Sequence, residues 1–324
     1  MIELYERTIR FQTIKELVRL LELGRQYRLV LWNMLHSRDD DYYSNWHIPK
    51  RDGGERTIQS PTQELRVVQR EILRHILDVL PVSPYAHGYV MGRNIATNAS
   101  HHTHSRSMIT ADIQDAFGTT SFAATCHRCK PWEGVSTSAE LGISDEMLQV
   151  VIEFVDYVDP DTNSRWLPQG APTSPAAFNY AMREVDRRLG QLATNVSGAY
   201  SRYADNLAFS MPSRAIDPKI VRAFLRDIRE PGFIVNPQKT HITYDGNRPE
   251  KPLRLPGVNI IEGDIVLPPS TVRLLRSKLY HAGQCGNYEV RHGIEGYALH
   301  IYGELPSQLR GIFKKGALHA SLCP

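Results

Sequence analysis

Two short apolar segments of this chain each carry an acidic residue where the segment ends or turns. Residues 107–113 form an apolar run that ends around Asp112, and residues 200–211 form two strand-like halves about Ala204 and Asp205. If the second segment is a hairpin paired with the first in one antiparallel sheet, Asp112 and Asp205 lie side by side. Neighbouring carboxylates repel one another unless a proton or a cation bridges them. The pattern therefore predicts a carboxylate pair on a sheet, suited to hard divalent cations such as Mg²⁺.

The segments around this pair predict both helices and hairpins. Helical periodicity fits the first forty residues and residues 143–157, 174–192 and 218–229. It is strongest at residues 62–80, where Thr62 is the expected N-cap. The sequence Asp-Gly-Gly at 52–54 predicts a hairpin turn, a second strand pair is expected across residues 262–264, and the last sixty residues show helical spacing. No internal repeat interrupts this pattern.

The composition excludes several classes of protein. Of 324 residues, 41% are hydrophobic and 23% are charged, which is not the composition of a disordered chain. No apolar run approaches the roughly 18 residues that a membrane-spanning helix needs. Charged residues within the first ten positions argue against a secretion signal. A cytoplasmic protein with no membrane partner is therefore expected.

The positive charge of the chain lies near its C-terminus. The formal net charge is +3, and residues 265–324 contain seven basic and three acidic residues. A basic terminal segment often binds a polyanion, although a solvated helical face has the same composition. Charge alone leaves both interpretations open.

Several motifs follow one another in an order that resembles reverse transcriptases. The most specific is LPQGAPTSP at 167–175; the others are HIPKRDGGERTI at 47–58, TADIQDAF at 110–117, RYADN at 202–206 and NPQKT at 236–240. NASHH at 98–102 fits the NAxxH pattern of the retron type. At 255–257, Leu-Pro-Gly keeps only the glycine of the usual retron Val-Thr-Gly. The chain is thus most similar to retron reverse transcriptases.

This resemblance implies an α+β, right-hand polymerase fold with fingers, palm and a helical thumb. The implied palm is an antiparallel sheet with helices. Residues 1–90 would form the N-terminal helices and fingers, and residues 91–247 the palm, with a finger insertion at about 120–165. Residues 248–324 would form the thumb.

The resemblance also implies phosphoryl transfer with two Mg²⁺ ions. Asp112 and Asp205, with the backbone carbonyl of Ile113, are the implied metal ligands, and Lys239 is an implied catalytic acid near the pyrophosphate. Asn206 departs from the pattern, because the family's second catalytic motif normally ends in two aspartates. An amide keeps the shape but lacks the charge, so metal affinity is expected to fall. The site then either works with two aspartates and substrate oxygens or is inactive.

Further residues are implied to bind the nucleotide and the nucleic acid. The expected nucleotide-binding residues are Lys50, Arg51, Arg56, Asp115, Phe117, Gln169 and Gly170. The three basic residues would clamp the triphosphate, and Phe117 would be a steric gate against a 2′-hydroxyl. The expected RNA or DNA contacts are Asn98, His102, Arg273, Arg276 and Lys278. Phosphate contacts by the last three predict salt-sensitive binding.

The implied function is DNA synthesis on a cognate structured noncoding RNA that serves as template and primer source. Deoxynucleoside triphosphates would be the substrates, DNA the product, antiphage defence the role and an accessory effector protein a further candidate partner. One alternative is a group II intron-like or CRISPR-associated reverse transcriptase, although the sequence shows no maturase or endonuclease segment. A second alternative is a catalytically inactive RNA-binding protein, for which Asn206 is the main support.

Overall fold

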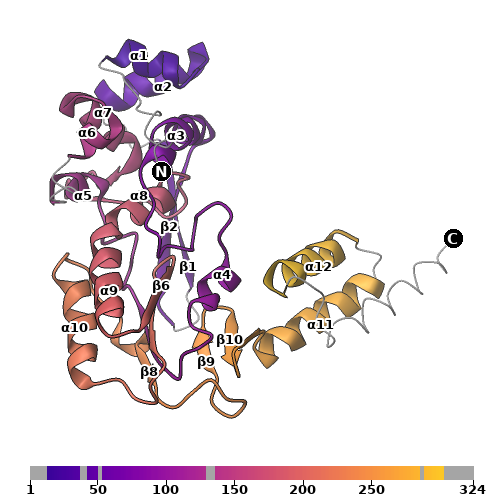
Figure 1. The fold of residues 1–324 in the computed structure, drawn as a ribbon. Coiled ribbons are helices and arrows are strands. Elements are labelled where there is room, and N and C mark those ends of the chain that lie inside the picture. Colours follow the sequence, from indigo (N-terminus) through magenta and orange to yellow (C-terminus); the bar gives the residue numbers. More distant parts are fainter. Residues whose placement is uncertain (1–12, 37–41, 50–52, 129–135, 285–287, 303–324) are drawn as a thin grey trace. The chain divides into compact units, whose positions relative to one another are not determined.

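The computed structural model describes residues 13–36, 42–49, 53–128, 136–284 and 288–302 (Figure 1). These residues form two compact units. The hairpin unit comprises residues up to 84, 113–187 and 231–234, and the sheet unit comprises residues 85–112, 188–230 and those from 235 onward. Each unit combines helices with antiparallel strands, which confirms the α+β class. None of the helices in the described ranges is long and apolar enough to cross a bilayer.

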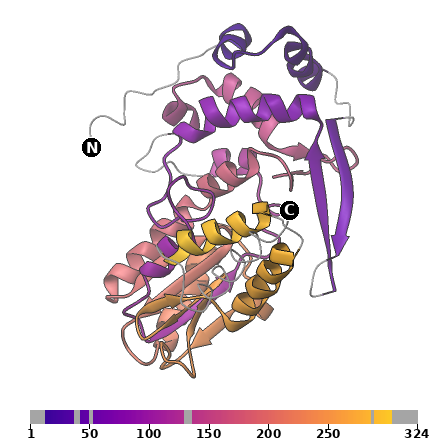
Figure 2. The ribbon, with the colours of Figure 1, turned by 90° about the vertical axis from the view of Figure 1, so that its right-hand side faces the viewer.

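The described part of the hairpin unit contains a long two-stranded hairpin and seven α-helices. Strand β1 (Tyr43–Pro49) pairs with β2 (Glu55–Pro61), as the turn signal at 52–54 predicts, and β4 (Tyr157–Val158) pairs with β5 (Arg165–Trp166). Figure 2 shows the β1–β2 pair as an extended ribbon. The helices are α1 (Ile14–Leu20), α2 (Arg25–His36), α3 (Gln63–His75), α5 (Phe122–Arg128), α6 (Thr137–Leu141), α7 (Asp145–Val155) and α8 (Ser174–Ala181).

Two helices differ from the sequence prediction. Thr62 caps α3 as expected, since its hydroxyl accepts a hydrogen bond of 3.3 Å from the amide of Leu65. However, α3 ends at His75, and a 3-10 turn follows. The helix expected over 174–192 is divided at Met182 into α8 and α9 (Arg183–Asn195). Apolar periodicity continues through Met182, so the pattern alone does not reveal the division.

A four-stranded antiparallel sheet lies at the centre of the sheet unit. Its strands are β3 (Ser107–Asp112), β6 (Ala199–Tyr203), β7 (Asn206–Met211) and β8 (His241–Thr243), in the order β6-β7-β3-β8. The β3–β7 register runs from Ser107 opposite Met211 to Asp112 opposite Asn206. The expected pairing of the 200–211 hairpin with the acidic strand is confirmed.

Different elements cover the two faces of this sheet. On one face Phe209 packs against Phe224 of α10 (Pro218–Arg229), with ring centroids 5.9 Å apart. On the other face Met108 and Ala208 join an apolar core with C-terminal elements. These elements are β9 (Leu253–Leu255), β10 (Val258–Ile261), β11 (Asp264–Val266), α11 (Pro269–Gln284) and α12 (Tyr288–Tyr302), and α4 (Ile95–Ser100) contributes Ala99 to the same core (Figure 1). Because side chains alternate along a strand, Asp112 and Asn206 lie on this second face.

The three-domain division stays a prediction. The boundaries expected after residues 90 and 247 divide the chain differently from the two compact units. The acidic strand, the acidic hairpin and the C-terminal helices all belong to the sheet unit.

Candidate active site

The two predicted catalytic acids lie at the end of β3 and in the turn between β6 and β7. Asp112 is 7% exposed and stands opposite Asn206. Asp205 is partly buried in the two-residue turn that joins Tyr203 to Asn206. Burial, and after it the negative charge of Asp112, raises the pKa of Asp205. This electrostatic strain is what a bridging cation would relieve, so the donor set fits a divalent metal.

Lys239 supplies a positive charge beside this pair. Its Nζ lies 3.1 Å from Oδ1 of Asp112. Lys239 ends the 3-10 turn Pro237–Lys239, which the side chain of Asn236 caps through the amide of Gln238 at 3.0 Å. The N–H of Asn236 donates a 2.8 Å bond to the carbonyl of Asp112. The backbone of Asp112 itself therefore anchors the turn that brings the lysine to its carboxylate.

Asn206 is hydrogen-bonded to its neighbour in the turn. Its Nδ2 donates a 2.9 Å hydrogen bond to Oδ1 of Asp205. Among the described residues, no group of three or more His, Cys, Asp or Glu side chains is arranged to hold a metal. A divalent cation bound by Asp112 and Asp205 would need further oxygens. Water and substrate phosphates commonly complete the coordination of Mg²⁺, and the role of the Ile113 carbonyl as a further ligand stays a prediction.

The acidic turn is held by close backbone and side-chain contacts. Ala204 has φ 56°, a conformation that costs an L-residue roughly 1 kcal/mol. The buried guanidinium of Arg202 donates a 2.9 Å bond to the carbonyl of Ala204. Gly88 lies so near the backbone nitrogen of Ala204 that a Cβ would overlap it. Neither Gly88 nor Arg202 is predictable as a support of this turn, because their contacts with Ala204 form only when the chain folds.

The structure corrects the prediction that His102 contacts nucleic acid. Its side chain is 0% exposed, with Nδ1 2.6 Å from Oγ of Ser210 and Nε2 2.7 Å from Oγ of Ser201. Burial, and after it the neighbouring histidines, lowers the pKa of His102 to about 3. Both ring nitrogens of this buried imidazole are bonded to serine hydroxyls, so it has no polar atom left for an RNA. Instead, it fastens the segment after α4 to the two strands of the acidic hairpin.

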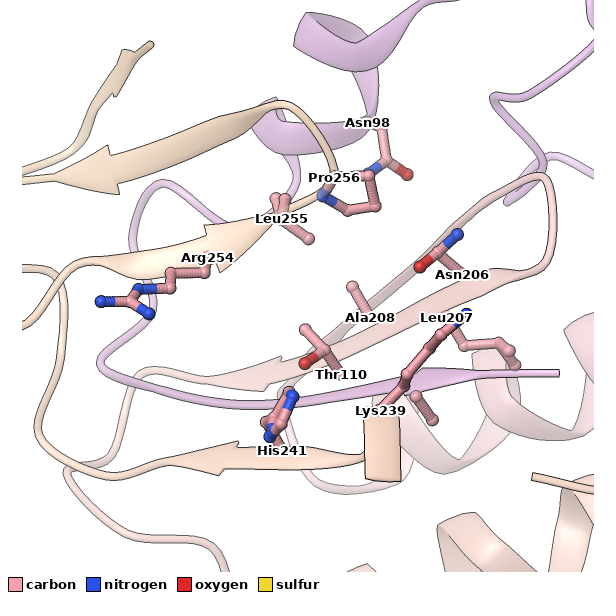
Figure 3. A pocket seen from close by; sticks show the side chains of 11 residues that line it. Asn98, Thr110, Asn206, Leu207, Ala208, Lys239, His241, Arg254, Leu255 and Pro256 are labelled. Atoms are coloured by element: carbon pink, nitrogen blue, oxygen red, sulfur yellow. The ribbon is translucent and has the colours of Figure 1, made fainter. Parts of the chain in front are cut away.

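Asn98 lines a pocket next to the predicted catalytic residues (Figure 3). The pocket has a volume of about 270 Å³ and lies between α4 and the end of β9 on one side and β3, β7 and β8 on the other. Its polar lining consists mainly of Asn98, Thr110, Asn206, Lys239, His241 and Arg254. Three of these side chains are basic, so the pocket is suited to an anionic ligand. His241 and Arg254 belong to no motif, so their place in the pocket is not predictable from the sequence.

In the hairpin unit, Gln169 and Gly170 lie against β2. The N–H of Gln59 donates a 2.8 Å hydrogen bond to the carbonyl of Gln169. Gly170 has φ 127°, and a Cβ there would lie 2.9 Å from the carbonyl oxygen of Gln59. Nε1 of Trp166 donates a 2.7 Å bond to Oε1 of Gln59. The buried Gln59 therefore joins the LPQG segment to the β1–β2 hairpin, a role that a single strand glutamine does not reveal in sequence.

Phe117 and Asp115 belong to the segment that follows β3. The ring of Phe117 is half-buried and packs against Phe178, with centroids 5.5 Å apart. Asp115 is exposed at φ 46°, and its carbonyl accepts a 2.9 Å bond from the N–H of Thr119. The nucleotide-binding roles of both residues stay predictions.

The predicted basic contacts lie on two elements. Arg56 is exposed on β2, and Arg273, Arg276 and Lys278 are exposed on α11. Lys50 and Arg51 lie outside the described residues. Exposure makes the four described side chains accessible to a polyanion, and their roles also stay predictions.

Comparison with known proteins identifies the family. The family model "Reverse transcriptase (RNA-dependent DNA polymerase)" matches residues 48–260, well over half of the chain. The Retron Mx162 reverse transcriptase of Myxococcus xanthus is 35% identical over 243 residues, which cover 70% of this chain and 50% of that protein. The Retron Ec86 reverse transcriptase of Escherichia coli is 30% identical over 240 residues, which cover 73% of this chain and 68% of that protein. The foamy viral protease-reverse transcriptase in complex with double-stranded DNA aligns with a TM-score of 0.45 and 16% identity. The alignment covers 79% of this chain and 36% of the viral chain.

The matched region contains the β1–β2 hairpin, the acidic strand and the acidic turn. The chain spans about half the length of the Mx162 enzyme and about two thirds of the Ec86 enzyme. The α+β polymerase fold expected from the motifs is the fold of this family. The chain therefore belongs to the reverse transcriptase family, and within it to the retron type.

Proposed function

We propose that this chain is an RNA-directed DNA polymerase that extends a primer on an RNA template with deoxynucleoside triphosphates. One observation carries the proposal. Asp112 ends β3, the turn with Asp205 leads directly into the neighbouring strand β7, and Nζ of Lys239 lies 3.1 Å from Asp112. Membership in the reverse transcriptase family supports the same reaction.

Asp112, Asp205 and the carbonyl of Ile113 are the proposed ligands for the cations. Two Mg²⁺ ions, when bound, would lower the pKa of the attacking hydroxyl and stabilise the leaving pyrophosphate. Lys239 would turn from Asp112 towards the pyrophosphate and donate a proton to it from Nζ. The bond from Asn206 would keep the carboxylate of Asp205 oriented during this exchange.

The remaining predicted residues would bind the substrates. Arg56, with Lys50 and Arg51, would hold the triphosphate, and Asp115, Gln169 and Gly170 would border the nucleotide. The ring of Phe117, held by Phe178, would exclude a 2′-hydroxyl from the incoming sugar. The basic residues of α11 would bind backbone phosphates of the template duplex.

A catalytically inactive RNA-binding protein is the second candidate, and Asn206 favours it. At ~4 Å and an effective dielectric constant of ~20, one charge acting on a divalent ion is worth up to about 8 kcal/mol before solvent and substrate compensate. Replacing that charge with an amide weakens metal binding. The two candidates differ in whether the remaining carboxylates suffice for catalysis.

Primer extension tests the proposal. The full chain, with Mg²⁺, deoxynucleotides and an RNA template annealed to a primer, should make DNA. Asp112→Ala should make none, whereas Asp264→Ala, a change of an exposed aspartate on β11, should leave synthesis intact. If the natural chain binds the RNA but extends no primer, while Asn206→Asp does, the inactive candidate is correct.

The proposed partners are a cognate structured noncoding RNA, which supplies template and primer, and an accessory effector protein in antiphage defence. A cytoplasmic location goes with these partners. Sequencing the RNA that copurifies with the full chain tests this part. One abundant structured RNA would support a retron RNA, whereas intron or CRISPR-array RNA would support the alternative reverse transcriptases.

A further inference from the structure

We propose that Asn98 recognises a hydrogen-bond donor on the nucleotide that lies in the pocket beside the catalytic turn, and that His102 is the residue that positions Asn98. The inference rests on the proposed function, because it assumes that a nucleic-acid strand occupies this pocket. Of these two residues of the NAxxH motif, Asn98 contacts the ligand and His102 does not.

The amide of Asn98 has a spare acceptor. The residue is 2% exposed, and its Oδ1 has no hydrogen-bond partner among the described residues. Its backbone is already used, since its N–H donates to Asn94 at 3.0 Å and its carbonyl accepts from Ser201 at 3.4 Å. A buried acceptor without a partner is unfavourable in the free protein. Asn98 lines the pocket, so a small rotation of its side chain would bring the buried Oδ1 to a donor on a ligand there.

The rest of the pocket indicates what that ligand is. Lys239, His241 and Arg254 contribute positive or protonatable side chains, which favour a phosphodiester. Thr110 and Ala208 contribute short side chains on the sheet, which leave room for a sugar or a base (Figure 3). Asn206, the neighbour of Asp205, lines the same pocket. A nucleotide of a nucleic-acid strand combines the anion with a neutral donor, either a sugar hydroxyl or a base amino group.

His102 fixes the place of Asn98 relative to the catalytic turn. Its ring bridges Ser201 on β6 and Ser210 on β7, the strands that the turn with Asp205 connects. Ser105 extends the network, with its Oγ 2.7 Å from Oγ of Ser210. Asn98 lies in α4, four residues before His102, so the bonds from His102 to β6 and β7 also hold Asn98 near these strands. His102 is a positioning residue, because its side chain is buried away from the pocket ligand.

The test compares the affinity of the full chain for matched template–primer duplexes, without deoxynucleotides and at one salt concentration. In one pair the primer ends in a ribonucleotide or its 2′-deoxy counterpart. In the other it ends in adenosine or in the purine analogue that lacks the amino group. The natural chain should lose about fivefold or more in affinity with one of these deletions, since the buried acceptor then stays unpaired. The pair that shows the loss identifies the donor.

Variants assign the effect to Asn98. Asn98→Ala should bind both members of the sensitive pair equally, and its unfolding temperature should stay the same or rise, because an unpaired buried group is removed. Asn195→Ala, a change of an exposed asparagine on α9, should discriminate like the natural chain. His102→Ala should reduce the discrimination ratio, and His102→Gln, which can still bond one serine, should recover part of it.

The inference is overturned if the natural chain extends primers but is insensitive to both deletions, or if Asn98→Ala keeps the natural ratio. It is also overturned for His102 if His102→Ala folds and discriminates normally. If the natural chain neither binds nor extends any of the duplexes, the proposed function itself is wrong. Extension by the natural chain therefore distinguishes the two kinds of failure.

Discussion

The side-chain amide of Asn206 donates a 2.9 Å hydrogen bond to the carboxylate of Asp205. Burial and the charge of Asp112 raise the pKa of Asp205, and this bond opposes them. The amide of Asn206 therefore favours the charged form of the Asp205 carboxylate. An aspartate at position 206 would instead repel that charged form. Without a bound metal, the turn with Asn206 is therefore more stable than a turn with two adjacent aspartates would be.

Asn206→Asp should therefore exchange stability for metal affinity. Without Mg²⁺, the added charge should lower the free energy of unfolding by about 1 kcal/mol, since like charges repel at this partly buried position. With Mg²⁺, the unfolding temperature should rise at lower metal concentrations than in the natural chain. Thermal unfolding across a Mg²⁺ titration measures both effects. Asn195→Asp is the control, and equal Mg²⁺ dependence in all three proteins would contradict the prediction.

Lys239→Met should slow synthesis while leaving the fold intact. Loss of the proposed proton donor should reduce the single-turnover rate about a hundredfold or more. Stability should fall by about 1–3 kcal/mol, because the buried carboxylate of Asp112 loses the cation beside it, although the Lys239 side chain is 54% exposed. Rapid-quench primer extension measures the rate. Lys219→Met, at an exposed lysine of α10, is the matched control, and a normal rate in Lys239→Met would refute the catalytic role.

The burial of His102 predicts a pH-dependent stability. Its pKa in the folded protein is lowered to about 3, whereas the unfolded chain takes up a proton near pH 6.5. Below that pH the unfolded state binds the proton that the folded state excludes, so stability falls as the pH decreases. Between pH 7 and pH 5 this component amounts to about 2 kcal/mol.

Urea unfolding of the natural chain and of His102→Asn should detect this component. The variant should be less stable at pH 7, because buried serine hydroxyls lose a partner. The difference in free energy of unfolding between the two proteins should be smaller by about 2 kcal/mol at pH 5. His292→Asn, at an exposed histidine of α12, should show no such narrowing. A constant gap would mean that His102 is protonated in the folded protein.

Gly88→Ala should disturb the catalytic turn. The added methyl group would overlap the backbone nitrogen of Ala204, so the backbone must move. Destabilisation of about 1–3 kcal/mol and a slower extension rate are expected. Gly296→Ala is the opposite case, since no atom lies within 4 Å of its added Cβ and alanine favours a helix by up to about 1 kcal/mol. Relative to the natural chain, the unfolding temperature should fall in Gly88→Ala and rise in Gly296→Ala.

The basic residues of α11 should determine the salt dependence of nucleic-acid binding. Each phosphate contact removed should lower the slope of log affinity against log salt by nearly 1. The test variant changes Arg273, Arg276 and Lys278 to glutamine. The control variant, with the same change of charge on α10, replaces Lys219, Arg222 and Arg229. Equal slopes in the two variants would remove α11 from the proposed binding surface.

The elements that sequence predicted well depend on short-range signals. The cap at Thr62 and the pairing of the strands on either side of residues 52–54 depend on signals within a few positions, and the structure has both. The division of the helix at Met182 was missed because apolar periodicity continues through it. His102 was misjudged because a polar loop residue next to a motif looks accessible in sequence. Its burial depends on serines about a hundred residues away.

The sequence by itself determined the two carboxylates and the antiparallel strands that bring them together, because apolar runs and the turn between them are local signals. The family motifs added the expected chemistry. Only the tertiary structure decided that Lys239 meets Asp112, although 127 residues separate them. It also decided that Gly88 contacts Ala204 and that Asn98 lines a pocket. These contacts arise where distant segments pack together, and the partners in such packing are set by the whole core rather than by neighbouring residues.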